Sequence, residues 1–473
     1  MRHTQASKQI ERENGLERVR LPAARAPEEA LLPQLTFALK NEGLNLCLLA
    51  QLFRHHIHPQ TVAEWVHEHP TSKPVRRLWF LYEWLTERRV PADDLAQGNY
   101  VPLADESLYY TVPGQRHRRQ RILFNLPGTA DFCPLIRRTP KLDAFDDEAF
   151  RRRCEKVINR YPQALMKRAL AWLFTKETRS SFAIESITPN ATRTERFIAL
   201  LHLAEKEDFC SKEALIDLQN RIVDERFADH DWRSSQNYVG QTTLRGEKVH
   251  YVPPPPDQVP GMMNSLCLAH GRMEMGNFPV LAHAAAVSFG FVFIHPFEDG
   301  NGRIHRFLLH NIFARRGLAP EGVIFPISAV MHRRPDQYDA LLEAFSRPLM
   351  LELDYQLDEQ GRISVAVPFP EYYRYPDLTL QTEGLLDFME ETLEKELTEE
   401  LDFLQRHDSA RTALREIVDL PDRQLDLFIR LCLHNSGRLS RTKREKFFDM
   451  LSDDEVRQLE ATLREHFNDQ SPE

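Results

Sequence analysis

Two apolar segments of the chain are joined by one short polar sequence, His295-Pro296-Phe297-Glu298-Asp299-Gly300-Asn301-Gly302-Arg303-Ile304-His305-Arg306. Apolar residues recur at helical spacing from about Pro279 to Phe293, and again from about Asn301 to Phe313. This periodicity predicts two helices, with the polar sequence forming the loop between them and the start of the second helix. Helical spacing also dominates most of the remaining chain, so we expect a mainly α fold.

The glycines of this loop predict a site for an anion. Gly300 and Gly302 allow backbone torsions that other residues avoid, so that successive N–H groups can point at one ligand. The N-terminus of the second helix adds positive potential at the same place. Arg303 and Arg306 are three residues apart and therefore share one helix face, from which both can reach a polyphosphate.

Two further residues of the loop supply chemistry. Asp299 offers hard oxygen ligands, which suit a magnesium ion held jointly with nucleotide phosphates. His295 titrates near neutral pH and can take a proton from an incoming hydroxyl group. Together these residues predict in-line attack of a hydroxyl on a phosphoryl group, with positioning and charge stabilisation supplying most of the rate.

The loop resembles the signature of the Fic family, HPFx(D/E)GNGRxxR, and matches it at every specified position. The resemblance implies a protein adenylyltransferase, which transfers AMP from ATP to a hydroxyl side chain of a target protein with the help of Mg²⁺. The roles that it implies are general base for His295, magnesium ligand for Asp299, packing anchor of the nucleotide site for Phe297, anion hole for Gly300, Asn301 and Gly302, phosphate contact for Arg303 and γ-phosphate contact for Arg306. The branch that resembles Doc kinases carries lysine in place of Gly302, so this chain follows the AMP-transferring pattern.

A second resemblance lies upstream, in a predicted helix of about residues 170–187. Ser181 and Glu185 match the inhibitory motif of the family, (S/T)xxxE(G/N), except that Ser186 stands where the family prefers glycine or asparagine. The resemblance implies that Glu185 pairs with Arg306 and blocks the γ-phosphate site, so that the enzyme restrains itself. It leaves open that the same glutamate assists removal of AMP.

Residues 237–252 read as a β-hairpin, followed by four prolines that force an extended segment. This hairpin resembles the family flap, which holds a segment of the target by strand addition. The flap residues expected to dock the target are Val239, Gly240, Val249, His250 and Tyr251.

Composition narrows the class of protein. The net charge of −9 argues against a chain that mainly coats nucleic acid, because lysine and arginine supply that affinity. No apolar run reaches the roughly 18 residues that a membrane helix needs, and no signal-peptide core is visible, so we expect no membrane contact and a cytoplasmic location. The six cysteines form no CxxC pair, which indicates reduced thiols rather than a zinc site or disulfides.

We expect three domains and a mainly α fold: an N-terminal helical and β region at 1–145, an all-helical Fic core with its hairpin flap at 146–352, and a helical C-terminal domain at 353–473 with a winged-helix-like pattern. Expected partners are target proteins with an acceptor Tyr, Thr or Ser, including the enzyme itself, and a second copy in a homodimer. One alternative is a DNA-binding regulator whose Fic centre senses nucleotide, since the helical spacing at both ends also fits a helix-turn-helix. Another is a Fic enzyme with a different donor, such as UTP or CDP-linked choline.

Overall fold

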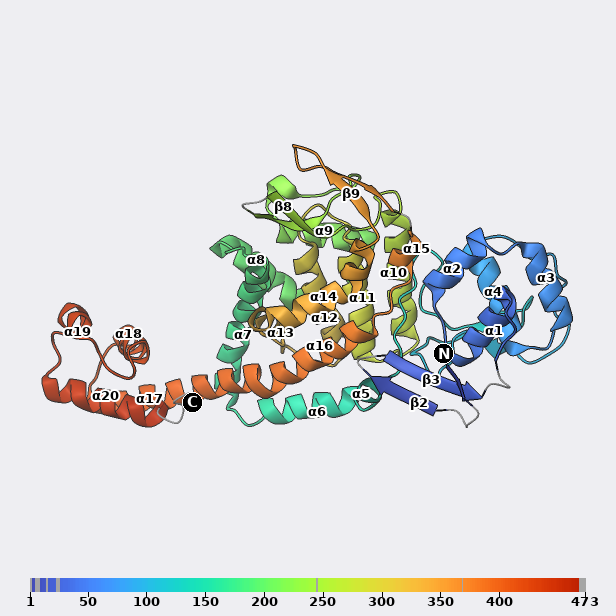
Figure 1. Cartoon of the computed structure of the whole chain (residues 1–473). Coiled ribbons are helices and arrows are strands. Elements are labelled where there is room, and N and C mark those ends of the chain that lie inside the picture. Colours follow the sequence, from blue (N-terminus) through green and yellow to red (C-terminus); the bar gives the residue numbers. More distant parts are fainter. Residues whose placement is uncertain are drawn as a thin grey trace. The chain divides into compact units, whose positions relative to one another are not determined.

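The computed structural model describes residues 2–4, 9–13, 16–22, 26–243, 246–367 and 369–467. The chain is mainly helical, as predicted (Figure 1). It divides into two compact units. The first consists of residues 1–145, 208–312 and 339–385, and the second of residues 146–207, 313–338 and 386–473. Within the described residues, no helix combines the length and the apolar character needed to cross a bilayer. All six cysteines are present as thiols.

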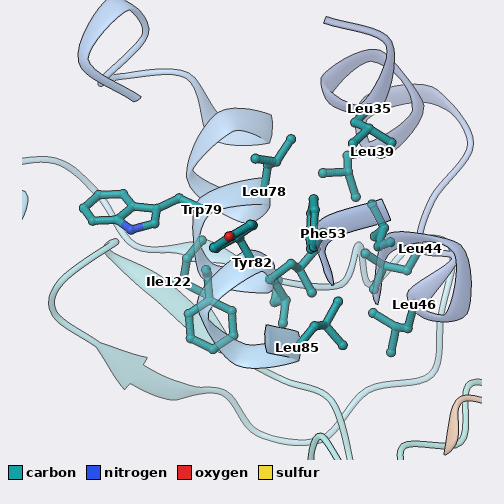
Figure 2. Packing of buried hydrophobic residues seen from close by; sticks show 14 of the residues in the cluster. Leu35, Leu39, Leu44, Leu46, Phe53, Leu78, Trp79, Tyr82, Leu85 and Ile122 are labelled. Atoms are coloured by element: carbon teal, nitrogen blue, oxygen red, sulfur yellow. The ribbon is translucent and has the colours of Figure 1, made fainter. Parts of the chain in front are cut away.

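The N-terminal part of the first unit is a helical cluster with short strands. Figure 2 shows its core, in which Phe53, Tyr82 and Leu85 from two helices pack together with Ile122 from a strand. The helices are α1 (Leu31–Asn41), α2 (Leu46–His55), α3 (Pro59–Glu68), α4 (Lys73–Thr86) and α5 (Pro140–Asp143). Strands β4 (Val101–Pro102), β6 (Ile122–Phe124) and β5 (Gln115–His117) form one sheet in that order, and strands β1 (Arg2–Thr4), β3 (Leu16–Pro22) and β2 (Gln9–Glu13) form another.

One apolar helix forms the centre of the rest of the first unit. Helix α11 (Val280–Ile294) is buried at every residue except Val292, as expected for a helix that is apolar all round. Gly290 permits the close approach of its neighbours, because a Cβ there would lie 3.0 Å from Leu266 and from Phe132. The other elements are α9 (Lys212–Ile222), η2 (Glu225–Phe227), β7 (Val239–Thr243), β8 (Gly246–Tyr251), α10 (Val259–Met275), α12 (Asn301–Arg315), α14 (Pro335–Met350), β9 (Asp354–Leu357), β10 (Ile363–Ala366), α15 (Glu371–Arg374) and α16 (Thr379–Glu391).

The second unit is helical throughout its described residues and is organised around a long helix, α7 (Gln163–Ile184). The carboxylate of Glu177 on α7 is fully buried and accepts a hydrogen bond of 2.9 Å from the backbone N–H of Ser328. Lys176, also on α7, pairs with Glu396 at 2.8 Å. The other elements are α6 (Asp147–Ile158), α8 (Ala191–Leu203), α13 (Ile327–Arg333), η3 (Thr392–Leu397), α17 (Thr398–Ile417), α18 (Asp422–Leu433), α19 (Arg441–Phe447) and α20 (Asp453–Phe467).

Ser186, which follows Glu185 just beyond the end of helix α7, has a positive φ. Ser186 has φ 57°, in the left-handed region that glycine and asparagine adopt most easily. Its N–H donates to Ala183 O at 2.9 Å, and the N–H of Ile187 donates to Phe182 O at 3.1 Å. This is the Schellman pair of bonds that closes a helix. Serine therefore forms here a helix end of the kind that glycine or asparagine adopts most easily.

We predict that Ser186→Gly stabilises the protein by about 0.5–1 kcal/mol. The left-handed conformation costs a non-glycine residue about 1–2 kcal/mol, and substitution by glycine removes this cost from the folded state. Glycine also gives the unfolded chain more conformational freedom, which takes back about 0.4–1 kcal/mol of the stabilisation. Chemical denaturation monitored by circular dichroism measures the difference. Ser180→Gly, inside the same helix, is the matched control and should destabilise the protein instead. Equal losses in both variants would contradict this description of the cap.

Candidate functional site

The predicted loop connects α11 to α12 and begins with a backbone reversal at His295. This residue ends α11 with φ 52° and ψ 59°, a left-handed conformation that is uncommon for a residue other than glycine. Its N–H still donates to Phe291 O at 2.9 Å, so the reversal occurs directly after the last helical bond. Residues held in such a conformation concentrate at functional sites.

The imidazole of His295 is arranged to act as a base. Nδ1 lies 3.3 Å from the carbonyl oxygen of Val292, which can only accept, so Nδ1 carries the hydrogen and Nε2 keeps its lone pair. Burial lowers the pKa of His295 to about 4, and the nearby positive charge of Arg233 acts in the same direction. The bond to Val292 and the charge of Asp299 oppose this shift. The ring is therefore neutral at pH 7.

Asn301 and Gly300 fix the shape of the loop. The Asn301 side chain accepts from Phe297 N at 3.1 Å and donates to Phe297 O at 2.7 Å. One side-chain amide therefore fixes both backbone polar groups of Phe297. Gly300 has φ +90°, and a Cβ there would lie 2.9 Å from Val223. Phe297 is fully buried against Trp232, with ring centroids 5.2 Å apart, and its role in a nucleotide site stays a prediction.

Asp299, the predicted magnesium ligand, is held by backbone and side-chain donors. Its Oδ1 accepts from Gly300 N at 2.6 Å and from Arg303 Nη2 at 2.7 Å. The carboxylate is 43% exposed, whereas Arg303 is fully buried and also donates to Ile222 O at 3.4 Å. The residues fit a magnesium ion, because a fixed carboxylate still faces solvent beside the N-terminus of α12.

Further carboxylates surround this position. The Asp229 Oδ2 accepts from the backbone N–H of Glu298 at 3.2 Å. Burial raises the pKa of Asp229, and the negative charges of Glu298 and Asp299 add to the effect. Excess negative charge in a small volume favours a cation there.

Arg233 is the main functional residue that sequence reasoning missed. It is 4% exposed, and its guanidinium donates to the carbonyl oxygens of His295 at 2.8 Å, Ser235 at 2.9 Å and Pro254. Its own N–H donates to Pro296 O at 2.8 Å. Burial lowers the pKa of Arg233 to about 10. This one side chain thus joins the reactive loop to both ends of the hairpin segment, and no local sequence pattern signals a contact that spans 62 residues.

Gln219 supports the other side of the loop and was likewise not predicted. Its fully buried amide donates to Asp299 O at 3.4 Å and to Asp229 Oδ2 at 3.1 Å, and it accepts from Asp229 N at 3.0 Å. The loop therefore lies between two buried polar side chains from distant segments, Arg233 and Gln219.

Comparison with known proteins identifies this arrangement. The model of the Fic/DOC family matches residues 209–313, which include α9, α10, α11, the loop and most of α12. The chain carries a Fic/DOC family domain. It is 29% identical over 120 residues to the protein adenylyltransferase Fic of Aedes aegypti, covering 25% of this chain and 22% of that protein. It is 28% identical over 148 residues to the Nematostella vectensis protein of the same description, covering 30% of each. The match therefore covers less than a third of these relatives.

Solved structures with a Fic domain are also similar to the chain. A Fic family protein from Desulfovibrio desulfuricans G20 matches 69% of this chain and 87% of its own, with 19% identity and a TM-score of 0.38. A Fic domain containing signaling protein from Bacteroides thetaiotaomicron matches 55% of this chain and 96% of its own, with 17% identity and a TM-score of 0.40.

The predicted flap of the Fic domain is a two-stranded antiparallel hairpin of β7 and β8, with a bulge between Val239 and Gly240. Residues 244–245, in the expected tip, lie outside the described residues. Val239 is 38% exposed, and Val249 and His250 are half-buried. Docking of a target by these residues stays a prediction. Tyr251 differs from the prediction: it is 7% exposed, and its hydroxyl donates to Phe293 O. Tyr251 thus anchors the flap to α11.

The two predicted inhibitory residues lie on the second unit. Ser181 is fully buried on α7, and Glu185 is a half-buried residue at the end of that helix. Arg306, their predicted counterpart, lies on α12 of the first unit and is 2% exposed. Pairing of Glu185 with Arg306 stays a prediction.

We predict that the His295 imidazole titrates near pH 4 and not near its ordinary value of 6.5. Histidine NMR signals followed against pH measure this, with His295→Ala used for assignment. Arg233→Gln should raise the pKa of His295, because it removes a positive charge that disfavours the imidazolium. Arg226→Gln is the control, since that arginine is exposed and pairs with Asp224. Titration of His295 near pH 6.5 would contradict the described environment.

Proposed function

We propose that this protein transfers AMP from ATP to a hydroxyl group of a protein side chain, with His295 as the general base. The observation that carries this proposal is the neutral His295 ring, whose Nε2 keeps its lone pair at the start of the loop that leads into the N-terminus of α12. A base next to an anion-binding helix end suits attack of a hydroxyl on a phosphate. The partial similarity to adenylyltransferases supports AMP as the group transferred.

In the proposed reaction, the hydroxyl oxygen of the target forms a bond to the α-phosphorus of ATP. The bond from that phosphorus to the bridging oxygen breaks, and pyrophosphate leaves with the electron pair. The hydroxyl proton moves to Nε2 of His295, which is unprotonated at neutral pH because its pKa is about 4. The backbone N–H groups of Gly300, Asn301 and Gly302 and the end of α12 would stabilise phosphate charge.

Asp299 would hold a magnesium ion, which neutralises phosphate charge when bound. The chain's own contribution is to fix this carboxylate. Gly300 N and the buried Arg303 hold one oxygen, Oδ1, while the group stays partly exposed. Arg303 therefore acts at least in part through Asp299, in addition to the phosphate contact that the resemblance implies. Arg306 is proposed to meet the γ-phosphate.

The flap would hold the target in an extended conformation. Within the described residues, β7 and β8 pair only with each other, so each strand has an outer edge to which a peptide can add. Pairing through the backbone positions an acceptor Ser, Thr or Tyr with little dependence on the neighbouring sequence. The same arrangement would allow modification of the enzyme itself.

The inhibitory motif on α7 is the proposed control element. The Schellman cap at Ser186 fixes the residue after Glu185, so the helix end presents this glutamate in a defined position. A carboxylate that pairs with Arg306 would compete with the γ-phosphate for the same guanidinium. Relief of this pairing would permit productive binding of ATP.

We predict that His295→Ala reduces AMP transfer by at least about 100-fold, because a positioned general base contributes about 10²–10⁴-fold. Transfer of label from α-labelled ATP to proteins of a host lysate, in magnesium, measures this. Both proteins should carry Glu185→Gly, so that inhibition does not mask the loss. His305→Ala is unsuitable as a control because His305 is fully buried; His230→Ala, outside the loop, serves instead.

We predict that Glu185→Gly alone raises transfer by roughly tenfold or more, since a charge-assisted bond is worth about 1.5–3 kcal/mol. Glu195→Gly, an exposed glutamate on α8 of the same unit, is the matched control and should leave transfer unchanged. Equal rates for wild type and Glu185→Gly would remove the inhibitory assignment while leaving the role of His295 intact.

The same assay separates the alternatives. Label from UTP or CDP-choline with none from ATP would change the donor and keep the catalytic residues. Absence of any transfer, together with salt-dependent binding of duplex DNA, would favour a DNA-binding regulator whose Fic centre senses nucleotide. The homodimer, the cytoplasmic location, the removal of AMP and the three-domain division stay predictions.

A further inference from the structure

A second group of ionisable side chains lies away from the His295 loop, within the first unit. It consists of Asp208, which precedes α9, and of His270 and Glu274, which are one turn apart on α10. One ligand atom from each residue lies within 4.8 Å of the other two. Neither the comparisons nor the proposed transfer reaction assigns a role to these residues.

The spacing of these atoms is compatible with a shared metal ion, and His270 Nε2 also lies within hydrogen-bond distance of Asp208 Oδ2, at 3.3 Å. His270 Nε2 is 3.3 Å from Asp208 Oδ1 and 3.7 Å from Glu274 Oε2. Hydrogen bonds of this type are usually about 2.7–3.2 Å long. Ligands that surround zinc tetrahedrally at about 2.0–2.1 Å are separated from one another by about 3.3–3.4 Å. The separation between His270 Nε2 and Asp208 Oδ1 matches the edge of such a tetrahedron, and the separation between His270 Nε2 and Glu274 Oε2 is about 0.3–0.4 Å longer than that edge.

A neighbouring histidine can orient the nitrogen that would bind the metal. His270 Nδ1 lies 3.0 Å from Nε2 of His283, which is fully buried on α11. When His270 Nδ1 donates to His283, the hydrogen is on Nδ1 and the lone pair of Nε2 points at the two carboxylates. Histidines that ligate metals ordinarily donate their second N–H to such an acceptor, which fixes tautomer and ring orientation.

Burial and charge are consistent with an ion that enters from solvent. His270 is 3% exposed, whereas the side chains of Asp208 and Glu274 are 44% and 30% exposed. Two carboxylates and a neutral imidazole carry two negative charges, which a divalent cation balances. One nitrogen and two oxygen ligands favour zinc over calcium or magnesium, which prefer oxygen alone.

We propose that Asp208, His270 and Glu274 form a site for a divalent transition-metal ion, with Zn²⁺ as the preferred ion. Three protein ligands leave a fourth position for water. The ion joins the segment before α9 to α10, and His283 connects it to α11. The site does not depend on the proposed AMP transfer.

The test measures zinc bound to the full chain after removal of metals with a chelator and equilibrium dialysis against Zn²⁺. We expect the wild type to bind one zinc ion per chain. The affinity for zinc should be at least tenfold weaker in Asp208→Asn/Glu274→Gln. These two side chains are partly exposed, so the variant should fold, which circular dichroism without metal verifies. Zn²⁺ should raise the melting temperature of the wild type and leave that of the variant unchanged. His283→Leu should weaken binding by about 10–100-fold.

Thiols are the main competing ligands, since Cys210 lies close to Asp208 and Cys267 is one turn before His270. The control variant is therefore Cys210→Ser/Cys267→Ser, which should still bind one zinc ion per chain. Substitution with Co²⁺ should give the visible bands of a tetrahedral nitrogen and oxygen site without a thiolate charge-transfer band. The proposal is overturned if the wild type binds no zinc, if Asp208→Asn/Glu274→Gln binds it equally well, or if the cysteine variant loses it.

Discussion

The reactive loop depends on one buried cation, Arg233, whose N–H groups donate hydrogen bonds to backbone carbonyl oxygens. Carbonyls that follow the end of a helix have no partner within that helix, and burying them without one costs free energy. Arg233 satisfies those of His295 and Pro296 and, at the same time, those of Ser235 and Pro254 on either side of the flap. The left-handed turn at His295 and the position of the flap are thus set by the same side chain. Burial is the largest cause of the low pKa of His295, and the charge of Arg233 lowers that pKa further.

Polar side chains inside an apolar unit define the rest of the loop. Asn301 holds the peptide groups of Phe297, Gln219 holds Asp299 O, and Arg303 holds the Asp299 carboxylate. The side chains of Asn301, Gln219 and Arg303 are almost completely buried, so water competes little at their ends of these hydrogen bonds, whereas the Asp299 carboxylate stays partly exposed. Catalysis of phosphoryl chemistry relies on positioning and fixed charge, and a loop held in this way needs little rearrangement during reaction.

Helix α11 connects the two groups of ionisable residues in this unit. His295 ends the helix, and His283 lies twelve residues earlier, which corresponds to about 18 Å along the axis. The intervening residues are apolar or small, and all of them except Val292 are buried. A metal ion bound at Asp208, His270 and Glu274 would hold α10 against the start of α11, at the opposite end from the loop. Such an ion would stabilise the scaffold of the loop without contacting the reacting atoms.

The sequence by itself determined the mainly α fold, the two helices that flank the loop, the hairpin and the residues of the signature, because periodicity and turn chemistry are local properties of a chain. Tertiary structure alone decided that Arg233 and Gln219 support the loop, that Tyr251 is buried, and that Asp208, His270 and Glu274 converge. These contacts join segments far apart in sequence, and they arise from packing around α11. No local pattern encodes which distant carbonyl or carboxylate a buried polar side chain will meet.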